Sequence, residues 1–149
     1  MREILFRGKR ADNGAWETGS LVRVRVGCHD EKDYIVDKMT GYHTPVIPET
    51  IGEYTGLTDK NGTKIFEGDI LRYSYEYEGS PWLKGRSLTD EDYRTGVVFW
   101  QYWRGSWAVC ARGKKQNINQ DVYVYCRNPN RVEVIGNIHD NPELLEVRE

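Results

Sequence analysis

Turn-forming residues recur along this chain about every ten residues, and that spacing restricts the fold more than any other feature. Glycines punctuate the chain from Gly8 to Gly113, and the longer interval before Gly136 is broken by asparagines at positions 117, 119, 128 and 130. Turn signals at this spacing favour short strands over long helices. We therefore expect many short strands joined by tight turns.

The segments between these turns have the composition and period of β-strands. Residues 21–26 alternate, with Val22, Val24 and Val26 on one face and arginines on the other, which is the pattern of a half-buried strand. Further strands are expected where β-branched and aromatic residues are enriched. They are residues 69–77, 96–103, 106–112, 122–126 and 132–138.

Evidence for helices is sparse, because no long window has an apolar stripe of helical period. Thr89 is expected to cap one short helical turn over 89–93, and Asn141 to cap another over 141–145. Two polar stretches predict long loops: residues 79–94 and 113–121. A loop of about 15 residues in a compact domain is usually functional or mobile. We predict an all-β fold with only short helical turns.

Two turns are defined by local chemistry. The segment 59–62 predicts a tight turn, because Asn61 and Gly62 tolerate the positive φ angles that a hairpin requires. Gly68 and Asp69 predict a second turn, in which the Asp69 carboxylate accepts backbone N–H groups. We interpret these four residues as structural turn residues.

The sequence offers little that would support catalysis or hold a metal. The cluster at 28–31 (Cys-His-Asp-Glu), even with His43 or His139, matches no metal-ligand spacing. The carboxylates near 59–69 are explained by the turns themselves. The chain has no nucleophile-elbow motif and no glycine-rich phosphate loop. We expect a protein that is not an enzyme and that uses no cofactor and no metal.

Charge and cysteine content bear on compartment and partners. The 21 lysines and arginines nearly balance 23 aspartates and glutamates, so nucleic-acid binding would require a local basic patch. Cys28, Cys110 and Cys126 are odd in number and lack paired spacing, which fits a reducing compartment and buried or half-buried thiols. With no signal-peptide pattern and no apolar span, we expect a cytoplasmic protein without membrane contact.

Three blocks of the sequence resemble the YopX family of phage and prophage proteins. They cover residues 3–22, 46–71 and 132–145, and they carry the pieces YTGL, DKNG, EGDI, IGN and NPELL in the family's order. The resemblance implies a small N-terminal β region, residues 1–50, followed by a C-terminal barrel similar to the SH3-type roll, residues 51–149. It implies a phage-encoded cytoplasmic accessory protein of the bacterial host, and it supplies no catalytic or ligand residue.

Aromatic and arginine residues are the strongest binding candidates. The candidate surface consists of Arg23, Arg25, Tyr73, Tyr75, Trp100, Trp103, Arg104 and Trp107. Such residues either fill the core of a small barrel and cover its rim, or stack bases on an open surface, worth about 1 to 3 kcal/mol per base. We favour a non-enzymatic protein-binding or self-assembling β module, with the valine face of residues 22–26 buried between subunits of a homo-oligomer. The alternative is a nucleic-acid-binding protein.

Overall fold

A computed structural model describes residues 1–111, 119–122, 126 and 129–146. Two antiparallel sheets form the chain, which confirms the predicted all-β class. The chain divides into two compact units, Met1–Gly56 and Leu57–Glu149. The domain limits suggested by the sequence, 1–50 and 51–149, and the SH3-type barrel stay predictions.

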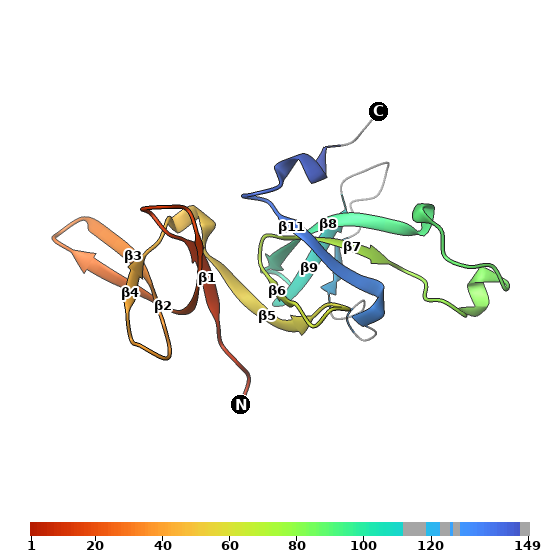
Figure 1. Ribbon diagram of the computed structural model, residues 1–149, viewed down its shortest axis with the longest axis horizontal. Helices are drawn as coiled ribbons and strands as arrows, with labels where there is room; N and C mark the ends of the chain where they lie inside the picture. The colour runs from red at the N-terminus through yellow and green to blue at the C-terminus, as the bar shows by residue number, and fades with distance from the viewer. Residues whose placement is uncertain (112–118, 123–125, 127–128, 147–149) are drawn as a thin grey trace. The chain divides into compact units, whose positions relative to one another are not determined.

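The first unit is a meander in which neighbouring strands are antiparallel (Figure 1). Its elements are β1 (Phe6–Lys9), β2 (Trp16–Val26), β3 (Asp30–Val36), β4 (His43–Pro45), the 3-10 turn η1 (Pro48–Thr50) and β5 (Gly52–Thr58). The spatial order is β4-β3-β2-β1-β5. Ile35, Val46 and Tyr54 are buried in this unit.

The predicted strand over 21–26 forms as the end of β2, but its valine face is not half-buried throughout. Val24 and Val26 are 41% and 44% exposed. The reason is that β1 pairs only with Trp16–Gly19, so the last residues of β2 pair with β3 alone. A two-stranded ribbon has no second layer to cover either face.

The second unit contains a five-stranded sheet in the order β10-β9-β8-β7-β11 (Figure 1). The strands of this sheet are β7 (Asp69–Ser74), β8 (Tyr93–Gln101), β9 (Ser106–Ala111), β10 (Asn119–Asp121) and β11 (Val132–Asn137). The unit also contains β6 (Lys64–Phe66), which pairs with β5 in the other sheet. Short 3-10 turns interrupt the strands: η2 (Pro81–Leu83), η3 (Asp90–Asp92), η4 (Pro129–Arg131) and η5 (Pro142–Leu145).

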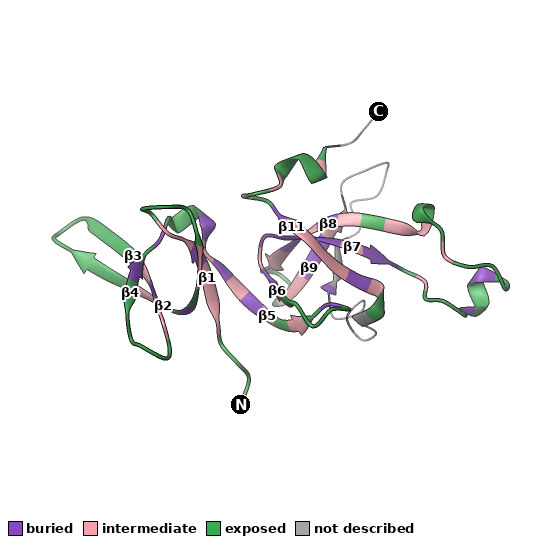
Figure 2. Ribbon diagram, in the orientation of Figure 1, coloured by how far each residue is buried: buried purple, intermediate pink, exposed green. Residues whose placement is uncertain are grey.

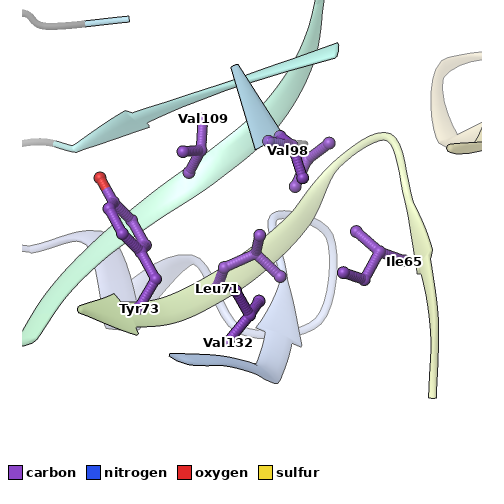
Figure 3. Close-up of a cluster of buried hydrophobic side chains, with 7 residues drawn as sticks. Ile65, Leu71, Tyr73, Val98, Val109 and Val132 are labelled. Carbon is purple, nitrogen blue, oxygen red and sulfur yellow. The ribbon is translucent and has the colours of Figure 1, made fainter. Parts of the chain in front are cut away.

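The core of the second unit is a cluster of apolar side chains contributed by most of its strands. Figure 3 shows several of them converging between β6, β7, β8, β9 and β11. The cluster consists of Ile65, Leu71, Tyr73, Val98, Val109, Val122 and Val132, each at most 2% exposed. Burying such side chains contributes roughly 1.5–3 kcal/mol each, so this cluster stabilises the unit.

The Asp59 side chain links the hairpin turn at 59–63 to strand β11 by hydrogen bonds. It is 3% exposed. Its Oδ1 accepts the backbone N–H groups of Asn61 and Thr63, both at 2.9 Å, and its Oδ2 accepts that of Val134 at 3.0 Å. The Lys60 N–H donates to the Val132 carbonyl at 3.0 Å. Residues 75 positions apart are therefore joined through one carboxylate.

Several predicted elements differ in extent. The strand expected over 69–77 ends at Ser74, the one expected over 96–103 runs from Tyr93 to Gln101, and the one over 132–138 is β11. The strand over 122–126 is wrong at its described ends, since Val122 and Cys126 have helical backbone and 123–125 lie outside the described residues. Arg112 also lies outside them.

The short helical turns agree better with the expectation than the loops do. The turns at 89–93 and 141–145 are confirmed as η3 and η5. The predicted loop over 113–121 lies mostly outside the described residues, but its end is strand β10. The predicted loop over 79–94 contains η2 and η3 and ends where β8 begins, so it is an ordered excursion with its own turns.

Candidate functional site

The predicted aromatic candidates of the second unit separate into core and surface. Tyr73 is a core residue, 2% exposed. Trp100 and Trp107 are half-buried and pack edge to face, with ring centroids 5.0 Å apart. Trp107 also contacts the core cluster. These three residues pack the sheet, as the core interpretation of the sequence predicts.

Trp103 and Arg104 lie on the surface at the turn between β8 and β9. Trp103 is 75% exposed, and the Arg104 guanidinium lies 4.8 Å from the centroid of its ring. Tyr75 is also exposed, but it follows the end of β7. Because β7 and β8 are antiparallel, Tyr75 and the β8–β9 turn lie at opposite ends of β8. The predicted residues therefore do not form one surface.

Arg23 and Arg25 belong to the first unit. The Arg23 guanidinium donates to both carboxylate oxygens of Asp33, at 2.7 and 3.1 Å. These hydrogen bonds lower the pKa of the buried Asp33 carboxyl against the opposing effect of burial. Arg25 is exposed near the end of the β2–β3 ribbon. Arg23 is thus occupied by an ion pair within its own ribbon.

The predicted turn residues lie where their backbone chemistry is used. Gly62 and Gly68 have φ angles of 77° and 86°, a region that disfavours side chains. The Asn61 N–H is one of the donors to Asp59. The Asp69 carboxylate is 1% exposed and accepts the Phe66 N–H at 2.7 Å. These contacts give the turn carboxylates a structural role.

A groove at the end of β7 gathers exposed aromatic side chains from the excursion over residues 75–92. Tyr75, Tyr77 and Trp82 are 59%, 44% and 81% exposed. The groove has a volume of about 370 Å³. It is lined by Tyr75, Glu76, Tyr77, Ser80, Pro81, Trp82 and Arg131, and we call it the aromatic groove. Figures 1 and 2 show the excursion reaching beyond the sheet and largely exposed, with a buried stretch at η2 that corresponds to Ser80 and Leu83.

Hydrogen bonds fix the near wall of the aromatic groove. Ser80 is 3% exposed; its hydroxyl donates to the Glu76 carboxylate and accepts the Trp82 N–H, which begins η2. The Ser74 hydroxyl donates to the Glu76 carbonyl at 2.7 Å. Leu83, the last residue of η2, is 2% exposed and anchors the turn. The exposed Trp82 is therefore held between two buried residues, Ser80 and Leu83.

Arg131 also lines the aromatic groove. Its Nε donates to the Ser74 carbonyl at 3.2 Å, and its guanidinium lies 5.9 Å from the centroid of the Tyr77 ring. Arg131 also lines a second hollow of about 170 Å³, whose walls include Glu78, Leu88 and Tyr93. Arg131 is the last residue of η4, directly before β11, and it joins a groove built mainly by the segment between β7 and β8.

Asp92 is the last residue of the excursion, directly before β8, and its carboxylate binds Arg86 and Thr89. Its two carboxylate oxygens each accept a guanidinium N–H of Arg86 at 2.8 Å, and one of them accepts the Thr89 N–H at 2.8 Å. Thr89 is the N-cap of η3, as the sequence predicts, and with Asp92 it forms a capping box. The Arg86 hydrogen bonds, followed by that from Thr89, hold the pKa of Asp92 far below its ordinary value.

The contacts of Asp92 with Arg86 and Thr89, which we call the clasp, predict how the order of the excursion depends on pH and on the Asp92→Asn variant. A depressed pKa in the folded state means that the stabilisation is fully present above the ordinary aspartate pKa, about 3.9, and is lost as pH falls through the lower folded value. The protection factors for hydrogen exchange over 86–92, which are corrected for the pH dependence of intrinsic exchange, should therefore stay constant from neutral pH to about pH 4 and fall only in stronger acid. At neutral pH, Asp92→Asn should make trypsin cleavage after Lys84 and Arg86 several-fold faster.

Glu91→Gln is the matched control for that experiment. Glu91 lies in the same 3-10 turn and is exposed, so its substitution should leave trypsin cleavage unchanged. Equal cleavage of Asp92→Asn and the unsubstituted protein would show that the clasp does not order the excursion.

The described residues contain no group of three or more side chains that could hold a metal. Among the described residues the cysteines form no disulfide. The expectation that all three are buried or half-buried is wrong for Cys28, which is exposed at the turn after β2. Among the described helical segments, none is long and apolar enough to cross a membrane.

Sequence reasoning missed three groove residues: Tyr77, Trp82 and Arg131. The sequence predicts a strand that includes Tyr77 with Tyr73 and Tyr75, but β7 ends at Ser74. Trp82 lay in a stretch identified only as a long loop, although its length was itself a signal of function. No local pattern signals Arg131, because it joins the groove only through the pairing of β11 with β7.

Comparison with known proteins identifies the family and structures of similar fold. A family model described as YopX protein matches residues 5–146. The crystal structure of protein EF1440 from Enterococcus faecalis is similar, with a TM-score of 0.51 and 21% sequence identity, over 98% of this chain and 100% of that chain. At this identity the likeness shows a shared fold. No curated protein matches the chain.

Proposed function

The chain belongs to the YopX family, and on that premise we propose that it is a phage- or prophage-encoded, non-enzymatic protein-binding module of the bacterial cytoplasm. The aromatic groove is its binding site. The observation that carries this proposal is the display of Tyr75, Tyr77 and Trp82 around one groove. Tyrosine, tryptophan and arginine are the residue types enriched among the dominant contacts of protein interfaces.

The order of the excursion supports a binding role. A loop that must be ordered on binding loses conformational entropy, which weakens the complex. Here Leu83 is buried, Ser80 is hydrogen-bonded, and the Arg86–Asp92 pair closes the far end. The exposed rings are therefore presented by a segment that is already structured.

Ion pairs elsewhere in the second unit favour a protein over a nucleic acid as the partner. The Arg72 guanidinium donates to the Asp90 carboxylate at 2.9 Å, and Arg86 pairs with Asp92. The Lys60 Nζ lies 3.1 Å from Oε2 of Glu133. Each of these cations already has a carboxylate partner. Nucleic-acid affinity depends on cations that replace the counterions of phosphates, and paired cations serve this purpose poorly.

Site-specific crosslinking tests the proposal. A photoreactive amino acid with an aromatic side chain, which keeps a ring at the position, is placed at Trp82 and, as the control, at the comparably exposed Trp103 on the β8–β9 turn. We expect discrete protein adducts from position 82 in phage-infected or lysogenic host cells, and none of the same adducts from position 103. Identical adduct patterns would refute the groove as the site, and a second copy of this chain as the adduct would assign it to self-assembly.

Trp82→Ala should abolish capture of that adduct partner by the purified protein without changing its stability. The side chain is 81% exposed, so its removal costs little in folding, whereas loss of a central interface tryptophan typically weakens binding by more than about tenfold. Capture of the partner and the thermal unfolding midpoint are the two measurements. Trp103→Ala should change neither, and equal loss in both variants would contradict the proposal.

A further inference from the structure

We infer that two copies of the chain pair through the free edge of β2, antiparallel and with Val24 of one copy opposite Val24 of the other. This inference concerns the first unit and is independent of the proposed function, since the aromatic groove belongs to the second unit. It depends on three properties of β2: the backbone groups free along its edge, the symmetry of its sequence and the balance of charge beside it.

One edge of β2 has no partner strand over residues 21–26. On the other edge these residues pair with β3, from Leu21 opposite Ile35 to Val26 opposite Asp30. The only other neighbour of β2 in its sheet is β1, which pairs with Trp16–Gly19 and stops there, within residues 1–56 that the structure describes in full. In an antiparallel strand about half of the backbone N–H and C=O groups point to each side. Those that point away from β3 are available to a further strand.

The sequence of this edge reads the same in both directions. Residues 22–26 are Val-Arg-Val-Arg-Val, with Val24 at the centre. Antiparallel pairing about Val24 therefore places Val22 opposite Val26 of the second copy, and the valines of both copies form one apolar row on the same face. Val24 and Val26, 41% and 44% exposed in the single chain, gain apolar neighbours. The homo-oligomer expected from the valine face thus forms through the strand edge.

Acidic residues of β3 balance the arginines that this pairing brings together. Asp33 lies opposite Arg23 and accepts from its guanidinium at 2.7 Å, and Glu31 lies opposite Arg25. Each row across the four paired strands then holds Asp33, Arg23, Arg25 of the second copy and Glu31 of the second copy. Like charges directly opposite each other are destabilising, but here each arginine has a carboxylate on its other side. The row has no net charge.

The free stretch of the β3 edge is less suited to pairing. β4 pairs only with Tyr34–Val36, so residues 30–33 also lack a partner strand on that side. All four carry charged side chains, which protect an edge, and the Asp33 carbonyl already accepts the Val46 N–H at 3.1 Å. Pairing of β2 with β2 is isologous and closes at a dimer, whereas pairing of β2 with β3 would continue head to tail.

Single-cysteine variants test the pairing and its register on the full chain. In a Cys28→Ser background, which also serves as the blank, each variant is oxidised by copper–phenanthroline and run on a non-reducing gel. Val24→Cys should form a covalent dimer, because opposite Cα atoms lie about 4.5–5.5 Å apart, within the range of a disulfide. Val22→Cys and Val26→Cys should each give several-fold less, since identical positions there lie about 13 Å apart along the strands. A mixture of these two variants should restore the crosslink.

Sedimentation equilibrium measures the dimer without a crosslink. Val24→Lys places two ammonium groups across the two-fold axis and should weaken the dimer about tenfold or more. Met39→Lys is the matched control, because Met39 is 94% exposed and lies outside β2, and it should leave the dimer unchanged. The thermal unfolding midpoint of both variants, measured on dilute monomer, should equal that of the unsubstituted chain.

Three results would overturn the inference. They are a monomer at every concentration, equal crosslinking at positions 22, 24 and 26, and assemblies larger than a dimer, which would indicate pairing of β2 with β3. The photocrosslinking at position 82 is a separate test, because it reports on the second unit. Its failure would refute the groove and leave the pairing of β2 as it stands.

Discussion

Asp59→Asn is expected to lower the free energy of unfolding of the second unit by about 3 kcal/mol. The buried carboxylate accepts three backbone N–H groups, from Asn61, Thr63 and Val134. An amide of the same shape has one oxygen, and its NH₂ group would face at least one of these donors. Hydrogen bonds to a charged group contribute about 1.5–3 kcal/mol, and a buried donor left without a partner costs about 1–3 kcal/mol.

Urea denaturation followed by tryptophan fluorescence measures this change. Four of the five tryptophans, Trp82, Trp100, Trp103 and Trp107, belong to the second unit, so the signal reports mainly on it. Asp90→Asn is the control, because the Asp90 side chain is 99% exposed and surface ion pairs contribute about 0–1 kcal/mol. A loss below about 1 kcal/mol for Asp59→Asn would show that the turn is held mainly by other contacts.

Gly96→Ala is expected to destabilise the second unit by about 3 kcal/mol or more. Gly96 is buried in β8 and pairs with Leu71 of β7 and Ala111 of β9. A Cβ atom there would lie 2.6 Å from the carbonyl oxygen and 2.8 Å from the carbonyl carbon of Cys110. Because the obstacle is backbone, a rotamer change cannot relieve it, and the central strand itself must shift.

Thr95→Ala, at the neighbouring position of the same strand, is the control. Thr95 is half-buried, and changing it should cost under about 1 kcal/mol, the full span of strand propensity. Both variants are compared by urea denaturation, with the exchange of backbone amides in β8 and β9 as a local readout. Equal stabilities for the two variants would contradict the close approach of β8 to Cys110.

The fold class was predictable because it depends on local patterns. Turn residues and strand composition are encoded in a few consecutive residues, and so are the helical turns that begin after Thr89 and Asn141. Asn141 also shows the limit, since it occupies the N-cap of η5 but its side chain instead accepts the Asn137 N–H. The exposure of Val24 and Val26 was not predictable, because it depends on how far β1 extends along β2.

The candidate site was predictable in its residue types and only partly in its members. Tyr75 was identified, and aromatic residues beside arginine do form the groove. Tyr73 and Trp107 are of the same residue types as the groove residues, but they do not line the groove. Tyr73 belongs to the core cluster, and Trp107 packs against it. Arg131 reaches the groove across 57 positions of sequence. Such contacts follow from strand order, which the sequence alone did not supply.

The attachment of the 59–63 turn to β11 bears on self-association as well as on stability. In the order β10-β9-β8-β7-β11, β11 is a border strand, and such strands expose backbone groups that template the addition of further strands. Here the Val132 carbonyl and the Val134 N–H are already bound by Lys60 and Asp59. The hairpin therefore occupies backbone groups of β11 that could otherwise pair with a strand of a second molecule. Loss of Asp59 would free the Val134 N–H for such pairing and favour aggregation.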